Sequence, residues 1–217
     1  SGLRKRGYVF EKNLETQAAA LFSRWRGMKT NLQIQAQTQA QQLTNSMPAV
    51  EAKMSYLSTI ARNPAIARSY YNQLKTDVDN LTQRAEAAES SLQGMYDGVE
   101  SEYNQLKHHL DEVDWMLTQL AQASFTLLPT EAGIMAVKAT FITGPKADDD
   151  DPQGNLYLTD QRLIFEQKEE VATKKVLFIT TERKLVQKMM FEIPVVMVET
   201  ITPTKQGVFK NEDHLEI

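Results

Sequence analysis

Apolar residues recur at alternating steps of three and four from Leu14 to Leu120, and this spacing constrains the fold more than any other feature. It keeps one stripe of a helix apolar and is typical of coiled coils. Asn63 and Pro64 interrupt the series, and they suit the N-cap and the first position of a new helix. The sequence therefore predicts two long helices joined near residues 62–65, with a candidate kink at 46–48, where Pro48 lies.

Charge is distributed unevenly along this helical part. Residues 1–35 are predominantly basic and residues 76–115 predominantly acidic. If the chain folds back at Asn63, position n lies beside position 127 − n, roughly, and opposite charges flank the apolar seam. Three basic residues then approach three acidic ones: Arg24, Arg26 and Lys29 against Asp97, Glu100 and Glu102. The pattern favours an antiparallel coiled-coil hairpin, and an intermolecular antiparallel dimer of extended helices is the alternative.

The composition changes near Pro129 from helix-forming to strand-forming residues. We therefore expect an α+β multidomain chain, with a helical domain over residues 1–127 and a β domain over residues 128–217. Short strands separated by turn residues are typical of an antiparallel sandwich or small barrel. The expected extended segments are 133–143, 155–167 with a turn at 159–162, 175–180, 188–194, 195–202, 208–209 and 214–217.

One segment of the β domain resembles a known family. Residues 154–165 read GNLYLTDQRLIF, which is similar to the Gly-x-Leu-x-Leu-Thr-x-x-Arg-Leu-x-Phe stretch of GRAM and bacterial PH-like domains. The residues that carry the resemblance are Gly154, Leu156, Leu158, Thr159, Arg162, Leu163 and Phe165. Later residues, from Phe191 to Leu215, match the second half of the family more weakly. The resemblance covers about residues 127–217, and the helical part resembles no family known to us.

The resemblance implies an antiparallel PH-like fold of two bent sheets capped by a C-terminal helix. It also implies a non-enzymatic role in binding membrane phosphoinositides or other proteins. The sequence ends at Ile217, before the expected capping helix, so either the chain is a fragment or the N-terminal helices cover that opening. The acidic residues Asp148 to Asp151 lie where lipid-binding relatives carry basic ones, and they would repel phosphate. Arg162, just inside a turn, is expected to anchor carbonyls or carboxylates through its rigid fork.

Several classes of function are disfavoured by what the sequence lacks. It has no cysteine, so disulfides, zinc knuckles and thiol catalysis are excluded. It has no apolar run of the ~20 residues that a membrane-spanning helix needs. It has no glycine-rich phosphate loop, nucleophile elbow or HExxH motif, and its net charge of −4 does not favour nucleic acid. We therefore expect a cytoplasmic chain that is not an enzyme and holds no cofactor or metal.

Two functions of different classes follow. The first is an intracellular adaptor or scaffold, in which the coiled coil self-associates or docks a protein partner and the PH-like domain binds protein. Its candidate interaction surface is basic: Lys174, Lys175, Arg183, Lys184 and Lys188. The alternative is a membrane-peripheral protein that binds anionic phospholipid through the PH-like domain or the basic N-terminus. The candidate membrane contacts are Arg4, Lys5, Arg6, Tyr8 and Phe10.

Overall fold

Long helices precede antiparallel sheets in the computed structural model, as expected for an α+β chain. The structure describes residues 2–142, 144, 148, 150–176, 179–206 and 212–217, with the backbone alone for 172–176, 179–182, 206 and 212. The chain divides into two compact units. One unit comprises Ser1–Lys12 and Lys107–Ile217, and the other comprises Asn13–Leu106. The division therefore lies within a helix and not at the expected junction of 127 and 128.

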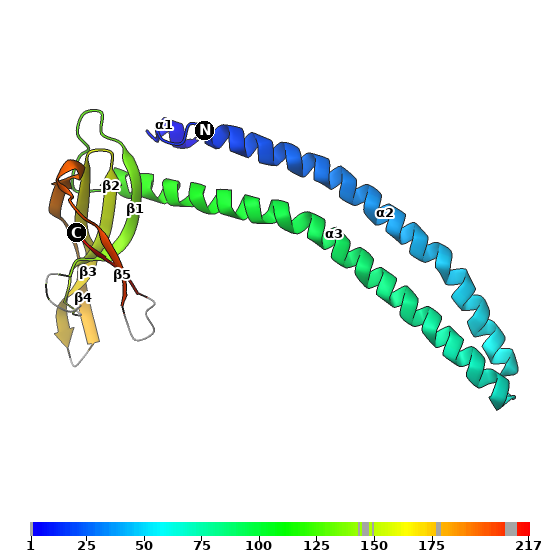
Figure 1. Cartoon of the computed structure of the whole chain (residues 1–217). Helices are drawn as coiled ribbons and strands as arrows, with labels where there is room; N and C mark the ends of the chain where they lie inside the picture. Colours follow the sequence, from blue (N-terminus) through cyan, green and yellow to red (C-terminus); the bar gives the residue numbers. More distant parts are fainter. Residues whose placement is uncertain (1, 143, 145–147, 149, 177–178, 207–211) are drawn as a thin grey trace. The chain divides into compact units, whose positions relative to one another are not determined.

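Two helices account for most of the first half of the chain (Figure 1). Helix α2 spans Leu14–Ile60 and is continuous through Pro48, so the sequence contains no second break there. Helix α3 spans Pro64–Ala121 and begins at the proline that the sequence predicted. The carbonyl of Asn63 accepts the first helical hydrogen bond, from the Ala67 N–H at 2.9 Å. The connection occupies residues 61–63, slightly before the expected 62–65.

Within residues 13–106, α2 and α3 run side by side in opposite directions (Figure 1). Ion pairs join Arg24 to Glu102 and Lys53 to Asp77. The rings of Tyr56 and Tyr70 lie 4.9 Å apart between centroids. These contacts agree with the register that the charge distribution predicted, including the expected approach of Arg24 to Glu102.

The β region forms two antiparallel sheets. Strands β1 (Gly133–Thr140), β2 (Gln153–Thr159), β3 (Arg162–Val176) and β4 (Ile179–Pro194) make a four-stranded sheet in sequence order. A short 3-10 helix, η1 (Val195–Met197), follows β4. Strands β5 (Thr202–Gln206) and β6 (Glu212–Glu216) pair as a two-stranded sheet. The N-terminal helix α1 (Gly2–Lys5) belongs to the same compact unit.

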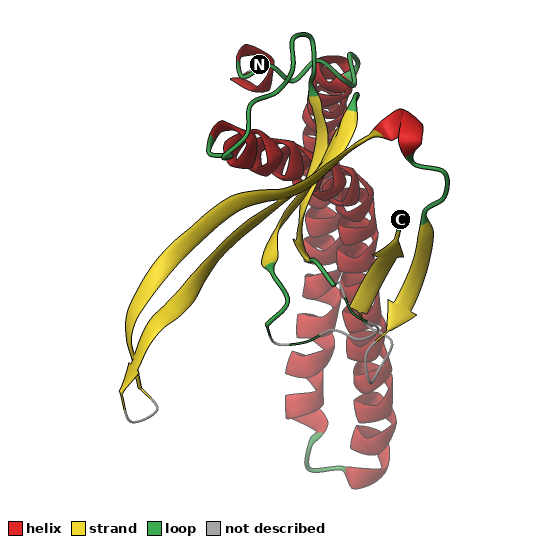
Figure 2. Ribbon diagram, turned by 90° about the vertical axis from the view of Figure 1, so that its left-hand side faces the viewer, coloured by secondary structure: helices red, strands yellow, loops and turns green. Residues whose placement is uncertain are grey.

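The sequence analysis was wrong about the strands after Gln167. It expected separate strands at 175–180 and 188–194, whereas β4 is one strand that pairs with the long β3 (Figure 2). The reason is that both arms are rich in Lys, Glu and Thr, so their apolar alternation is too weak to indicate a strand. Most of 195–202 is not extended either, since η1 begins there. The expected segment 208–209 lies outside the described residues.

The core of this unit lies between the sheet and the end of α3. Met116 is 1% exposed, and Tyr157 and Ile164 are completely buried on the sheet face that meets it. The opposite face carries an aromatic cluster in which the ring centroid of Phe141 lies 5.5 Å from that of Phe165 and 5.2 Å from that of Phe191. Strand alternation explains the division, because successive side chains point to opposite faces.

Gly154 is required for the pairing of β2 with β3. A Cβ atom at this position would lie 1.9 Å from the carbonyl oxygen of Glu166 and 2.8 Å from the Cα of Gln167. Both neighbours are backbone atoms of β3, which cannot move without breaking the ladder. The glycine of the family-like motif therefore has a local structural reason.

We predict opposite effects of two Gly→Ala substitutions. Gly154→Ala should lower the free energy of unfolding of the sheet unit by about 2 kcal/mol or more, because the methyl group collides with backbone. Gly94→Ala in α3, where a Cβ would meet nothing within 4 Å, should raise the stability of the helix pair by ~1 kcal/mol. Hydrogen exchange of the β2–β3 amides should accelerate in the first variant alone; equal protection in both variants would contradict the prediction.

Candidate interaction surfaces

The basic N-terminal segment uses its charged groups within the chain. The Arg4 guanidinium donates to the carbonyls of Tyr8 at 3.0 Å, Phe10 at 2.6 Å and Glu11 at 2.8 Å. Arg6 pairs with Asp114 on α3. Tyr8 is 3% exposed, and burial raises the pKa of its hydroxyl, to which nearby Glu11 adds.

The candidate membrane contacts are therefore not presented together. Arg4, Arg6 and Tyr8 fold the segment onto the end of α3, while Phe10 is half-buried and packs on Tyr8 with 6.1 Å between ring centroids. Lys5 is exposed. The arrangement favours a structural role for this segment, because a headgroup would have to displace hydrogen bonds that the arginines already make.

The motif residues Thr159 and Arg162 build a buried polar cluster with Glu131. The Arg162 guanidinium donates two bonds to this carboxylate, from Nε at 3.0 Å and from Nη2 at 2.9 Å. It also donates to the Thr126 carbonyl at 2.9 Å and pairs with Glu192. The Thr159 hydroxyl donates to Glu131 at 2.6 Å and accepts the Arg162 N–H at 2.9 Å. This cluster joins β2, β3, β4 and the segment that precedes β1.

The charges of this cluster stabilise each other. Burial by itself raises the pKa of the Glu131 carboxyl, but hydrogen bonds from Arg162, Thr159 and the Leu128 N–H outweigh burial and hold that pKa below its ordinary value. The hydrogen bond to Glu131 likewise raises the pKa of the Arg162 guanidinium. The Arg162 side chain is only 10% exposed, so its fork anchors the fold, as expected, and is not open to a ligand.

A second buried polar group attaches the end of α3 to the sheet. Glu166 is completely buried and accepts from the Ser124 N–H at 2.5 Å, the Gln187 amide at 3.0 Å and the Tyr157 hydroxyl at 3.2 Å. Burial raises the pKa of the Tyr157 hydroxyl, and the Glu166 carboxylate adds to the effect. In the described residues, every buried side-chain nitrogen and oxygen has a hydrogen-bond partner, so this cluster offers no vacant binding group.

The candidate basic surface is divided between two faces of the β3–β4 ladder. Lys184 and Lys188 are four residues apart and lie on one face of β4, whereas Arg183 lies on the other. All three are exposed, and Arg183 approaches Glu170 across the ladder at 3.5 Å. The side chains of Lys174 and Lys175 lie outside the described residues. The three described basic residues thus do not make one continuous patch.

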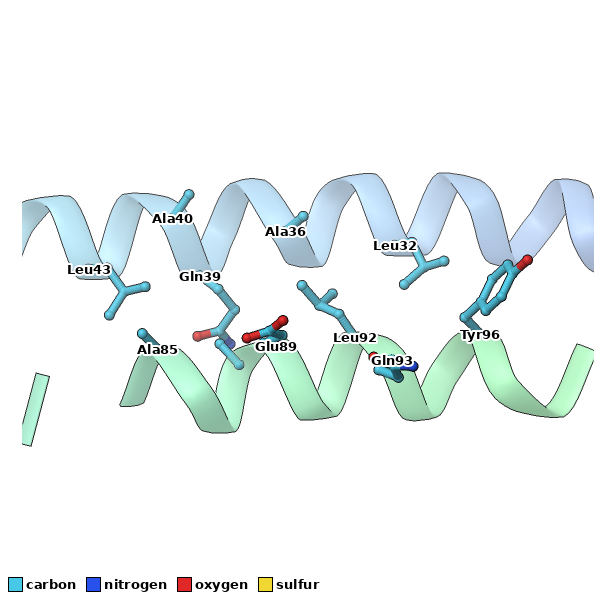
Figure 3. Close-up of a pocket in the computed structure, with 11 residues that line it drawn as sticks. Leu32, Ala36, Gln39, Ala40, Leu43, Ala85, Glu89, Leu92, Gln93 and Tyr96 are labelled. Carbon is cyan, nitrogen blue, oxygen red and sulfur yellow. The ribbon is translucent and has the colours of Figure 1, made fainter. Parts of the chain in front are cut away.

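A groove of about 620 Å³ opens between α2 and α3 (Figure 3). Four alanines line it: Ala36, Ala40, Ala85 and Ala88. Just before the groove each helix takes two consecutive steps of four, through Leu32 to Ala36 and through Leu81 to Ala85, which locally unwinds the seam. Small side chains at this irregularity leave the space open between the two helices.

The two sides of this helix pair differ in character. The half-buried residues occupy heptad positions a and d, and in an antiparallel pair the e positions of both helices share one side. The e positions hold Phe22, Lys29, Ala40, Met47 and Met54 on α2, and Tyr71, Val78, Glu89, Tyr96 and Tyr103 on α3. We call this side the e-face. The g positions of the other side are mostly polar: Arg24, Asn31, Gln42, Ala49 and Tyr56, with Ile66, Gln73, Asn80, Arg84, Ser91, Gly98 and Gln105.

The e-face is exposed in the single chain. Its large apolar side chains are between 38% and 61% exposed, the extremes being Tyr96 and Met54. No residue from 15 to 98 is buried, and Ala40, Glu89 and Tyr96 of the e-face also line the groove. The sequence analysis missed this face because it followed the a and d stripe alone. The seven-residue spacing from Met47 to Met54 and from Tyr71 to Val78 was the available signal.

Two further classes of site were sought in the described part of the chain. It contains no helix apolar enough over a sufficient length to cross a bilayer. It also contains no group of three or more His, Asp or Glu side chains placed to hold a metal ion. The surfaces described above are therefore the ones that bear on function.

The buried pair predicts a specific dependence of stability on pH. Because the folded-state pKa of Glu131 lies below the ordinary 4.5, the ionised carboxylate contributes stability that is complete above that pH and is lost as the pH falls through the folded-state pKa. Glu131→Gln should lower the free energy of unfolding by about 3–5 kcal/mol at neutral pH. This deficit should shrink as the solution is acidified below pH 4.5.

Urea unfolding can be followed by the fluorescence of Trp115 in a Trp25→Phe background, which reports on the sheet unit alone. Glu192→Gln is the matched control. This carboxylate binds the same guanidinium, but its side chain is 45% exposed, so its loss should cost no more than about 1 kcal/mol. Equal costs for the two variants, or a deficit for Glu131→Gln that does not change with pH, would contradict the prediction.

Comparison with known proteins gives this chain no family. No family model, no curated protein and no solved structure matches it. Its function must therefore be inferred from the surfaces themselves.

Proposed function

We propose that the chain is a non-enzymatic adaptor or scaffold, in which the helix pair is an antiparallel coiled-coil hairpin that serves assembly. The observation that carries the proposal is the exposed e-face. A strict two-helix coiled coil needs apolar residues at a and d alone, whereas helices of larger bundles carry a third apolar position at e or g. The e positions of this pair follow the second pattern.

The sheet unit is proposed to be a PH-like domain that binds protein. The family-like residues support this proposal, since Gly154 admits the backbone of β3 and Thr159 and Arg162 close the turn between β2 and β3. Apolar side chains exposed at η1 suit a protein partner better than a phosphate group. Val196 is 94% exposed and Met197 is 69% exposed.

The scaffold proposal predicts that the e-face contacts protein in the cell. Benzoylphenylalanine in place of Met54, on the e-face, should yield a recurrent protein adduct on irradiation of cells that express the full chain in its native host. The same probe in place of Ala49, at a g position of the same helix, should yield little. Adducts identified by mass spectrometry distinguish this chain from a second protein, and both outcomes support a scaffold.

The proposal fails under a clear condition. If the probe at Met54 gives no more protein adducts than the probe at Ala49, the helices are not an interaction element. Met47→Glu provides a second check, since a charge on the same face should abolish the Met54 adduct while far-UV circular dichroism shows the helices intact.

A further inference from the structure

We propose that the e-face binds a second copy of this chain, so that two helix pairs form a four-helix dimer with two-fold symmetry. The inference rests on the proposed function and names the partner of its helices. It is carried by two features of residues 13–106: the size of the exposed apolar face and the arrangement of the charges along its edges.

The e-face is large enough for a stable dimer. From Phe22 to Met54 it extends roughly 50 Å at 1.5 Å per residue, and two helices of about 10 Å diameter make it roughly 20 Å wide. This footprint, on the order of 1,000 Å², compares with the ~800 Å² per partner of a standard interface. Its large side chains include the aromatic and methionine residues that interfaces favour.

The charges at the edges of the e-face select a second copy. Heptad position b lies directly outside position e, and four b residues are charged and exposed: Arg26, Glu51, Lys75 and Glu100. Away from the turn, α2 presents the cation and α3 the anion. Near the turn, Glu51 of α2 and Lys75 of α3 reverse this order. Among the described residues, none of the four makes an ion pair within its own chain.

This alternation is self-complementary under a two-fold rotation. If the axis runs along the helices, α2 of one copy covers α3 of the other, and Arg26 meets Glu100 while Glu51 meets Lys75. If the axis runs across the helices, like covers like in the opposite direction, and Arg26 meets Glu51 while Lys75 meets Glu100. Isologous contacts of this kind are the usual basis of homodimers, and both arrangements match opposite charges.

The groove provides space at the centre of this interface. It lies between the two ends of the e-face and is lined by alanines, so its floor is lower than the side chains on either side. The e positions near its ends are bulky, with Met47 on α2 and Tyr96 on α3. Either rotation brings such side chains of one copy toward the alanine-lined space of the other.

Light scattering coupled to size exclusion, and sedimentation equilibrium for the dissociation constant, test the inference on the full chain. The wild type should be a dimer. Met47→Glu should weaken the dimer by about tenfold or more, while Gln42→Glu, a charge at a g position of the same helix, should not. Far-UV circular dichroism confirms that both variants keep their helices.

A charge exchange separates the two arrangements. Arg26→Glu should also weaken the dimer by about tenfold, because like charges then meet across the interface. A second substitution, Glu100→Arg, restores the dimer if the axis runs along the helices, and Glu51→Arg restores it if the axis runs across them. Restoration by either one supports the inference.

Three results would overturn it: a monomeric wild type, equal effects of Met47→Glu and Gln42→Glu, or no restoration by either second substitution. A monomer that still forms a Met54 adduct with another protein would refute the dimer and leave the scaffold proposal in place. A monomer without such an adduct would refute both.

Discussion

A pair of helices can enclose only the side chains that lie on its shared seam, and this geometric limit governs the helical half of the protein. The a and d residues of α2 and α3 are half-buried, not buried, because each has water on at least one side. The stability of so long a pair must come from many small contributions along the seam, with exposed ion pairs such as Arg24–Glu102 adding little and fixing register. Any apolar residue outside the seam is left to a partner.

The sheet unit follows a different principle, because it buries charged groups. Glu131 and Arg162 are withdrawn from water and held by bidentate geometry, an arrangement that specifies one structure more than it stabilises it. Glu166 has the same role at the end of α3, where three donors satisfy it. These clusters explain why polar residues of the family-like motif face inward. They also remove Arg162 from consideration as a ligand-binding residue.

Local features of the sequence were read correctly where a short-range physical rule determines them. Pro64 begins α3 because proline suits a first helical position and follows Asn63. The turn between β2 and β3 lies where polar residues separate two apolar segments. The strands from Glu169 to Lys188 were missed because an exposed ladder needs no apolar alternation, and pairing between distant residues supplies what propensity does not.

The sequence by itself determined the two long helices, their break at Pro64, their relative register and the motif that joins β2 to β3. Each of these depends on residues close in the chain or on a repeat with a fixed period. Only the tertiary structure decided which charges are used up and which remain available. It folded Arg4, Arg6 and Tyr8 onto α3, divided Arg183 from Lys184 and Lys188 between two faces, and placed Met54 and Tyr71 on a common side. Such assignments depend on which elements become neighbours, and a single chain of letters does not contain that proximity.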